Sequence, residues 1–315
     1  CFPLPKSTKW SLQAEMKSVP DFKSISPKQL SIMINKKSNN YGNGLYLNVP
    51  RFKQPVPLFI IFRAFNIISD KEICEFILDE SDSKEMWNFL IASIYDANQY
   101  LTYEDAMTYI TSIVLYTPIN MDIAQGNKKK RAYAEDIINN DIFPHCRTIM
   151  QKKYFLGYMT KQLILCKFGL IKPTDRDSYV NKRIDSTGTL LNNLFRNYFN
   201  KVVKDTQKQV IREINNGSWR STNNFEEIIN STNIYKIVKP NTIENGIKRA
   251  LATGDFGLKQ INNNKVGVAQ VLNRLTYISS LSHLRRINTP IDKSGKLVQP
   301  RKLHNSSWGF VCCAE

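Results

Sequence analysis

The motif Asp175-Arg176-Asp177 places two carboxylates two residues apart, a spacing that can hold a divalent cation in some sugar-nucleotide transferases. Arg176 lies between the carboxylates, and Lys182 and Arg183 follow. Because these cations can neutralise the carboxylates directly, a salt-bridged turn explains the motif without a metal. We therefore interpret it as a turn and keep a metal-dependent transferase as an alternative.

The other reactive side chains form no recognisable catalytic motif. The three histidines, His145, His283 and His304, lack the nearby carboxylate and Ser or Cys of a nucleophilic triad, and Cys146 adjoins His145 in sequence only. The sequence also lacks glycine-rich nucleotide-binding loops and the H-E-x-x-H motif of metalloproteases. Its six cysteines show neither C-x-x-C pairing nor zinc-finger spacing to histidine, which favours reduced thiols inside a cell. We expect no catalytic residue, no zinc site and no other metal site in this chain.

Two basic stretches late in the sequence have side chains suited to phosphate and sugar. Residues 282–290 combine adjacent arginines with hydroxyl, imidazole and amide groups, and residues 301–305 repeat this chemistry. A solvated charged loop has the same composition. Composition alone therefore leaves nucleic-acid contact and an ordinary loop both open.

The whole chain is strongly basic, with 44 Lys and Arg against 27 Asp and Glu, a net charge of +17 over 315 residues. Residues 246–315 alone contain 11 of the cations and 3 of the acids. Such an excess favours a polyanionic partner: nucleic acid first, an anionic membrane second and an acidic protein third. With 42% hydrophobic residues the chain is too apolar to be intrinsically disordered, and its length allows two domains of ordinary size or one large domain with a satellite.

The first elements that must position these residues are strands. Apolar and polar residues alternate between residues 10 and 50, which predicts an antiparallel sheet built from three runs. The apolar members of these runs are Trp10, Leu12, Ala14 and Met16; Leu30, Ile32 and Ile34; and Leu45, Leu47 and Val49. Three prolines between residues 50 and 57 mark the end of this region.

Residues 56–170 have the pattern of helices. Ser69 with Glu72, and less clearly Thr102 with Asp105, have the spacing of capping boxes at which helices begin. The apolar window 56–68 is interrupted by Arg63 and is too short to cross a bilayer, so we expect no membrane span. Apolar residues on most faces predict a largely buried helix at 154–170.

Helices are also expected in the second half of the chain. An apolar stripe at helical spacing over residues 189–214 predicts a helix whose stripe packs in a core. An Asn-rich surface loop follows at 215–224. Asn241 with Glu244 then begins a short helix that Gly254 ends.

Six segments of the sequence, taken together and in order, identify a protein family more specifically than any one of them does alone. They are VPLFIIFRAFNI (56–67), FLGYMTKQLILC (155–166), DRDSYVNKRIDSTGTLL (175–191), GIKRALATGDFG (246–257), GVAQVLNRLTYISSLSHLRRINTPI (267–291) and GKLVQPRKLHNSSWGFVCCAE (295–315). Together they resemble the second-largest subunit of multisubunit DNA-directed RNA polymerases of the eukaryotic polymerase II type. The last two segments are similar to the fork region of that subunit, and the resemblance covers roughly residues 45–315.

The resemblance implies an α+β fold made of several domains. These would be a small antiparallel sheet of protrusion strands at 1–55, a mostly helical lobe at 56–183, a return into the protrusion at 184–245 and an α/β fork region at 246–315. Asp175-Arg176-Asp177 then falls where the lobe returns to the protrusion, which supports its interpretation as a turn.

In this family the fork lies beside the active centre. Its loops face the RNA–DNA hybrid and the downstream edge of the transcription bubble, the melted stretch of DNA. By position in the motifs, the resemblance places seven residues near nucleic acid: Gln270, Arg274, His283, Arg285, Arg286, Arg301 and Lys302. Residues 255–264 would be the first fork loop and residues 292–296 the second.

The resemblance further implies that the chain is part of a nucleotidyltransferase, the DNA-directed RNA polymerase. In this family the catalytic Mg²⁺ is bound mainly by an aspartate triad in the largest subunit, and nothing in this chain resembles that triad. We expect the isolated chain to be inactive. Its expected partners are the largest and other polymerase subunits, template DNA, nascent RNA and ribonucleoside triphosphates, with no membrane. Its basic residues would contribute positioning and charge stabilisation, which phosphoryl transfer requires.

Three features depart from the family pattern. Cys313 stands where the family usually has proline, the sequence stops at Glu315 before the usual Thr-Pro-Glu-Gly, and the Asn-rich loop at 215–233 looks enlarged. The first two leave open a basic nucleic-acid-binding or scaffolding remnant of the fold without catalysis.

The Asn-, Lys- and Ile-rich usage suggests an AT-rich genome, of a large DNA virus or a protist. The expected location is intracellular: the nucleus for a cellular protein, and the host cytoplasm (a viral factory) or the virion for a viral one.

Overall fold

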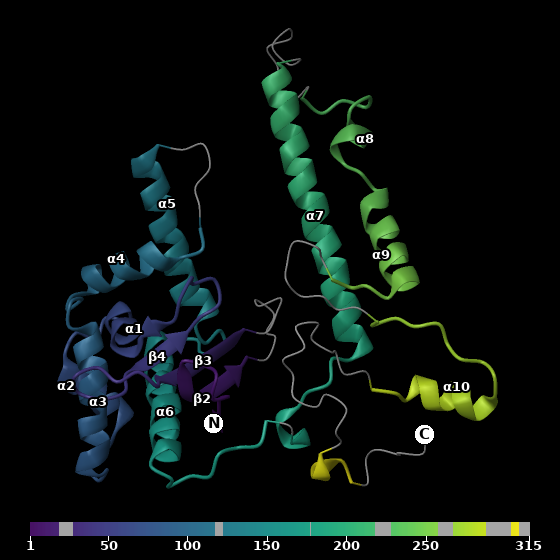
Figure 1. Ribbon diagram of the computed structural model, residues 1–315. Helices are drawn as coiled ribbons and strands as arrows, with labels where there is room; N and C mark the ends of the chain where they lie inside the picture. Colours follow the sequence, from purple (N-terminus) through teal and green to yellow (C-terminus); the bar gives the residue numbers. More distant parts are fainter. Residues whose placement is uncertain are drawn as a thin grey trace. The chain divides into compact units, whose positions relative to one another are not determined.

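A computed structural model describes residues 1–18, 28–116, 122–176, 178–217, 228–257, 267–287 and 304–308 (Figure 1). The chain divides into two compact units, Cys1–Asp177 and Ser178–Glu315. The first unit combines an antiparallel sheet with helices, and the described part of the second contains helices. The predicted α+β fold class is confirmed.

Five antiparallel strands form one sheet in the first unit, and they neighbour one another in chain order. The strands are β1 (Phe2–Pro3), β2 (Trp10–Lys17), β3 (Gln29–Asn35), β4 (Leu45–Asn48) and β5 (Val56–Pro57). The register pairs Ala14 with Ile32 and Ile32 with Leu47, and all three side chains are buried. The alternation in the sequence therefore predicted the sheet. Burial is not confined to one face, because Ser31 and Met33 of β3 are buried as well.

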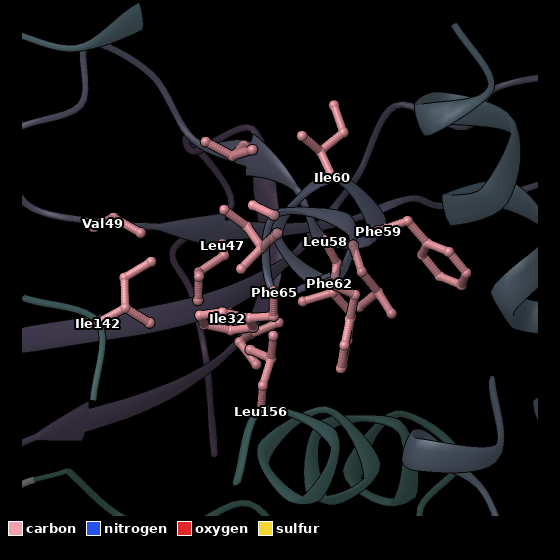
Figure 2. Close-up of a cluster of buried hydrophobic side chains, with 14 of the residues drawn as sticks. Ile32, Leu47, Val49, Leu58, Phe59, Ile60, Phe62, Phe65, Ile142 and Leu156 are labelled. Carbon is pink, nitrogen blue, oxygen red and sulfur yellow. The ribbon is translucent and has the colours of Figure 1, made fainter. Parts of the chain in front are cut away.

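The helices of the first unit share a core with the sheet. They are α1 (Leu58–Ala64), α2 (Asp70–Ile77), α3 (Lys84–Ala97), α4 (Tyr103–Ile113), α5 (Ile123–Asp136), the π-helix η1 (Ile137–Asp141) and α6 (Ile149–Lys167). Every residue of α1 is buried, the charged Arg63 included. Figure 2 shows Leu58 and Phe62 of α1 among side chains of the sheet, with Leu156 of α6 below them. None of the described helices combines the length and apolarity needed to cross a membrane.

Of the two capping boxes predicted in this unit, one is present in full and the other lacks its side-chain hydrogen bond. Thr102 and Asp105 form a complete capping box at the start of α4, in which the Asp105 N–H donates to Thr102 Oγ1 at 3.2 Å. Helix α2 begins after Ser69 as predicted, but the Ser69 side chain makes no capping hydrogen bond. A box that was not predicted, Thr148 with Gln151, begins α6. Helix α6 is buried on one side only, since Tyr154 and Tyr158 are exposed.

The described helices of the second unit are η2 (Tyr179–Asn181), α7 (Thr187–Asn216), α8 (Ile234–Ile237), α9 (Asn241–Thr253), α10 (Tyr277–Leu284) and η5 (Asn305–Ser307). Helices α7 and α9 pack side by side (Figure 1). Leu194 of α7 and Ala250 of α9 form the buried centre of this contact. Gly246 of α9 is needed there, because a Cβ at this position would collide with the ring of Tyr198. Gly254 ends α9 with φ of 69°, as predicted for a helix-terminating glycine.

The predicted core packing of the α7 stripe holds fully at one residue. Leu194 is buried, Tyr198, Val202, Val210 and Ile214 are half-buried, and Leu191, Phe195 and Ile211 are 39–48% exposed. The physical reason is the size of the neighbouring element: α7 has 30 residues, whereas α9 has 13 and covers one side of part of it. Periodicity predicted the helix correctly, but it carried no information on what covers each face.

Candidate nucleic-acid interface

Residues 267–287, called the α10 segment below, contain five of the seven residues that the sequence placed near nucleic acid. The segment starts at Gly267 with φ of 76° and then runs without regular structure to Thr276. Thr276 and Ser279 form a capping box that begins α10, with the Ser279 N–H donating to Thr276 Oγ1 at 3.1 Å. The helix is thus fixed locally, by its own first turn.

Three arginines give the α10 segment its charge. Arg274, Arg285 and Arg286 are all exposed, and residues 267–287 include no Asp or Glu. Arg285 is the C-terminal cap of α10, where the helix dipole favours a cation. Among the described residues, neither Arg274 nor Arg285 forms a salt bridge. A guanidinium without a neighbouring carboxylate keeps its full attraction for phosphate, which it can bind through two N–H groups at once.

Gln270 and His283 lie close to each other and make direct contact. The Nε2 atom of His283 and the Oε1 atom of Gln270 are 3.0 Å apart, and the backbone N–H of Asn273 donates to His283 Nδ1 at 3.1 Å. Both ring nitrogens of His283 therefore have partners within the segment. The hydroxyl of Ser280 donates to the carbonyl of Asn273 at 2.7 Å.

Apolar side chains of the α10 segment also face solvent in the described structure. Val271, Leu275, Tyr277 and Ile278 are each more than three-quarters exposed, and no residue of α10 is buried. Exposed apolar groups interleaved with arginines are typical of a surface that contacts another molecule.

The remaining predicted residues lie outside the described structure. Arg301 and Lys302 belong to this group, as do residues 258–264 of the predicted first fork loop and the whole of the second. Residues 304–308, which follow, are described. There the Nδ1 atom of His304 accepts a hydrogen bond from the Ser306 N–H at 3.0 Å, and the Tyr179 N–H donates to Ser306 Oγ at 3.0 Å.

The aspartate motif at 175–177 is described in part. The guanidinium of Arg176 lies over the ring of Phe2 at 5.3 Å, and Asp177 lies outside the described residues. Across the described ranges, no three His, Cys, Asp or Glu side chains come together as a metal site would require.

His145 and Cys146 lack the electrostatics of a catalytic pair. Burial lowers the pKa of His145, as does the nearby Lys152, and the ring of His145 packs edge-on against Phe155 at 4.7 Å. Burial also raises the pKa of the Cys146 thiol. A cysteine nucleophile needs the opposite shift, because the thiolate is the reactive form.

Sequence reasoning missed two residues of this site, Asn273 and Ser280. Asn273 acts through its backbone N–H and carbonyl, and Ser280 through its hydroxyl, which donates to that carbonyl. The sequence alone does not indicate either bond. The Thr276-x-x-Ser279 pattern was the available signal, since it is the spacing of a capping box and would have placed the start of α10.

Comparison with protein families gives matches over both units. The family described as RNA polymerase Rpb2, domain 2, matches residues 22–185, and RNA polymerase Rpb2, domain 3, matches residues 270–315. The first match alone covers more than half of the chain. The chain belongs to the family of RNA polymerase Rpb2, the second-largest subunit of DNA-directed RNA polymerase.

Relatives in this family come from cellular and viral sources. DNA-directed RNA polymerase II subunit RPB2 of Encephalitozoon cuniculi is 38% identical over 311 residues, 96% of this chain and 25% of the relative. DNA-directed RNA polymerase II subunit 2 of Arabidopsis thaliana is 33% identical over 98% of the chain and 25% of the relative. DNA-directed RNA polymerase subunit 2 of Acanthamoeba polyphaga mimivirus is 31% identical over 95% of the chain and 25% of the relative. The chain thus spans about a quarter of the length of these relatives.

Proposed function

We propose that this chain supports template-directed RNA synthesis, as part of the second-largest subunit of a DNA-directed RNA polymerase, by holding DNA and the RNA–DNA hybrid near the active centre. The contacts would come from Arg274, Arg285 and Arg286 of the α10 segment, with Gln270 and His283 near the nucleic acid beside them. Arg301 and Lys302 would add to them. These contacts are to phosphate and sugar, so they suit an enzyme that transcribes any sequence.

The observation that carries the proposal is the charge of the α10 segment. It presents three exposed arginines and no carboxylate, and it lies almost wholly within the part of the chain that matches Rpb2 domain 3. A cationic surface of this kind binds a polyanion and releases counterions from it.

A division of labour in the assembled enzyme is part of the proposal. We propose that the catalytic Mg²⁺ is held mainly by the largest subunit and that this chain alone does not polymerise nucleotides. The partners would be the largest and other subunits, template DNA, nascent RNA and ribonucleoside triphosphates. Residues 1–55 and 184–245 would form the protrusion, 56–183 the lobe and 246–315 the fork. The site of action would be the nucleus of a cell, or a viral factory or virion.

Replacing Arg285 or Arg301 by alanine tests this proposal. In the assembled polymerase we expect each substitution to shorten the lifetime of the elongation complex, because each removes a contact to phosphate. Each should also lower the slope of log affinity against log salt by about one unit. The measurements are the dissociation rate of a preformed elongation complex and the affinity of the polymerase for the same nucleic acid, each over a series of salt concentrations.

Arg212→Ala is the matched control, since Arg212 is an exposed arginine of α7 outside the α10 segment. It removes the same charge and should leave the salt slope unchanged. Unaltered lifetime and slope for both Arg285→Ala and Arg301→Ala would contradict the proposed contacts. If the chain bound nucleic acid but never entered a polymerase with a largest subunit, a non-catalytic binding remnant of the fold would be the better account.

A further inference from the structure

A continuous chain of hydrogen bonds runs across the α10 segment. The side-chain amide of Gln270 donates from Nε2 to the carbonyl of Gly267 at 3.1 Å, and its Oε1 faces His283 Nε2 at 3.0 Å. The other ring nitrogen, Nδ1, meets the backbone N–H of Asn273 at 3.1 Å. Each end of this chain is a backbone group.

The backbone groups determine where every proton lies. The N–H of Asn273 can only donate, so Nδ1 of His283 must be unprotonated. The proton of the neutral ring is therefore on Nε2, which donates to Gln270 Oε1. The carbonyl of Gly267 can only accept, so it selects the amide orientation of Gln270 that presents Oε1 to the ring. All these directions agree with one another.

These bonds clamp the residue next to Arg274. The Asn273 N–H is held by His283 and the Asn273 carbonyl by Ser280, so both backbone polar groups of one residue are bound to side chains of α10. No residue of α10 is buried, so among the described residues this attachment relies on polar contacts. It attaches the backbone next to Arg274 to α10, the helix that ends at Arg285.

We propose that Gln270 and His283 are a positioning pair, which holds Arg274 and Arg285 at a fixed spacing for the phosphates of the bound nucleic acid. This role rests on the proposed function. In it, Gln270 and His283 position the arginines and do not themselves bind phosphate. A backbone that already holds the two arginines at the required spacing loses less conformational freedom on binding, so the pair would increase affinity without touching the nucleic acid.

The first test is the protonation state of His283. The chain contains three histidines, so ¹⁵N-histidine labelling gives three imidazole signals, and the one lost in His283→Asn is that of His283. At neutral pH we expect its ¹⁵N shifts to show an unprotonated Nδ1 and a protonated Nε2. A ring protonated on Nδ1, or one that averages between the two tautomers, would overturn the proposal.

The second test is a double-mutant cycle in the assembled polymerase. Gln270→Ala removes the hydrogen bond between the two side chains. His283→Asn removes the same bond, but the amide oxygen of the new asparagine side chain can still accept from the Asn273 N–H. Loss of one net hydrogen bond corresponds to a lifetime of the elongation complex about fivefold shorter. We expect this change in each single variant and no further loss in the double variant, with the salt slope unchanged in all three.

The outcomes separate the positioning role from the alternatives. If the two effects multiply in the double variant, Gln270 and His283 bind nucleic acid independently and the proposal is wrong. It is also wrong if none of the three variants changes the lifetime, or if His283→Asn lowers the salt slope as a lost cationic contact would. Arg285→Ala and Arg301→Ala variants that are both without effect would instead reject the proposed function, and the ¹⁵N spectrum would still decide whether the clamp exists.

Discussion

Arg63→Ala is expected to lower the free energy of unfolding of the first unit by about 3–5 kcal/mol. Arg63 is fully buried in α1. Its Nη1 donates at 2.6 Å to the carbonyls of Ala97 and Tyr100, at and just beyond the end of α3, and its Nη2 contacts Asp70 Oδ1 at 2.6 Å. The substitution leaves these acceptors without their donor and opens a cavity, and both effects favour the unfolded state.

Urea unfolding measures this change, with hydrogen exchange of peptides from residues 1–177 to assign it to the first unit. Lys71→Ala is the control, because Lys71 is highly exposed and forms only a surface pair with Glu75 at 3.7 Å. That control should cost no more than about 0.5 kcal/mol. A loss of similar size in the two variants would show that the buried arginine does not hold α1, α2 and α3 together.

Gly157→Ala should also destabilise the first unit, by about 3 kcal/mol. Gly157 is buried in α6, and a Cβ at this position would collide with the backbone carbonyl of Phe76 in α2. Backbone cannot yield as a flexible side chain can, so α2 and α6 would have to move apart. The same urea unfolding experiment measures the cost.

Gly188→Ala provides the matched control for a glycine within a helix. Gly188 lies in the first turn of α7, and nothing within 4 Å would meet its added Cβ. Alanine favours helix over glycine by about 0.5–1 kcal/mol, so this variant should be neutral or slightly stabilised. Equal stability of Gly157→Ala and the unsubstituted chain would contradict the close contact between α2 and α6.

Local patterns predicted the elements of the fold well. The alternation of residues 10–50 predicted β2, β3 and β4, and Thr102 with Asp105 marked the start of α4. Gly254 ended α9 as expected. These features depend on neighbours within a few residues, so the sequence contains the information that they need.

Features that depend on distant residues were not predictable. Arg63 looked like an interruption of an apolar window, because its partners come from α2 and from the end of α3. The exposure of the α7 stripe depends on the length of α9. At the candidate site, the resemblance placed Gln270 and His283 near nucleic acid, but only the structure shows that the two side chains bind each other.

Site-specific photocrosslinking in the assembled polymerase tests the central claim most directly. A photoreactive phenylalanine derivative in place of Ile287, which is 61% exposed, keeps Arg285 and Arg286 and lies beside them. The same derivative at Tyr235 of α8, which is 77% exposed, is the control. Elongation complexes with labelled RNA and DNA should crosslink from position 287 and not from position 235. A polymerase that elongates normally without any crosslink from position 287 to RNA or DNA would contradict the proposed role of the α10 segment.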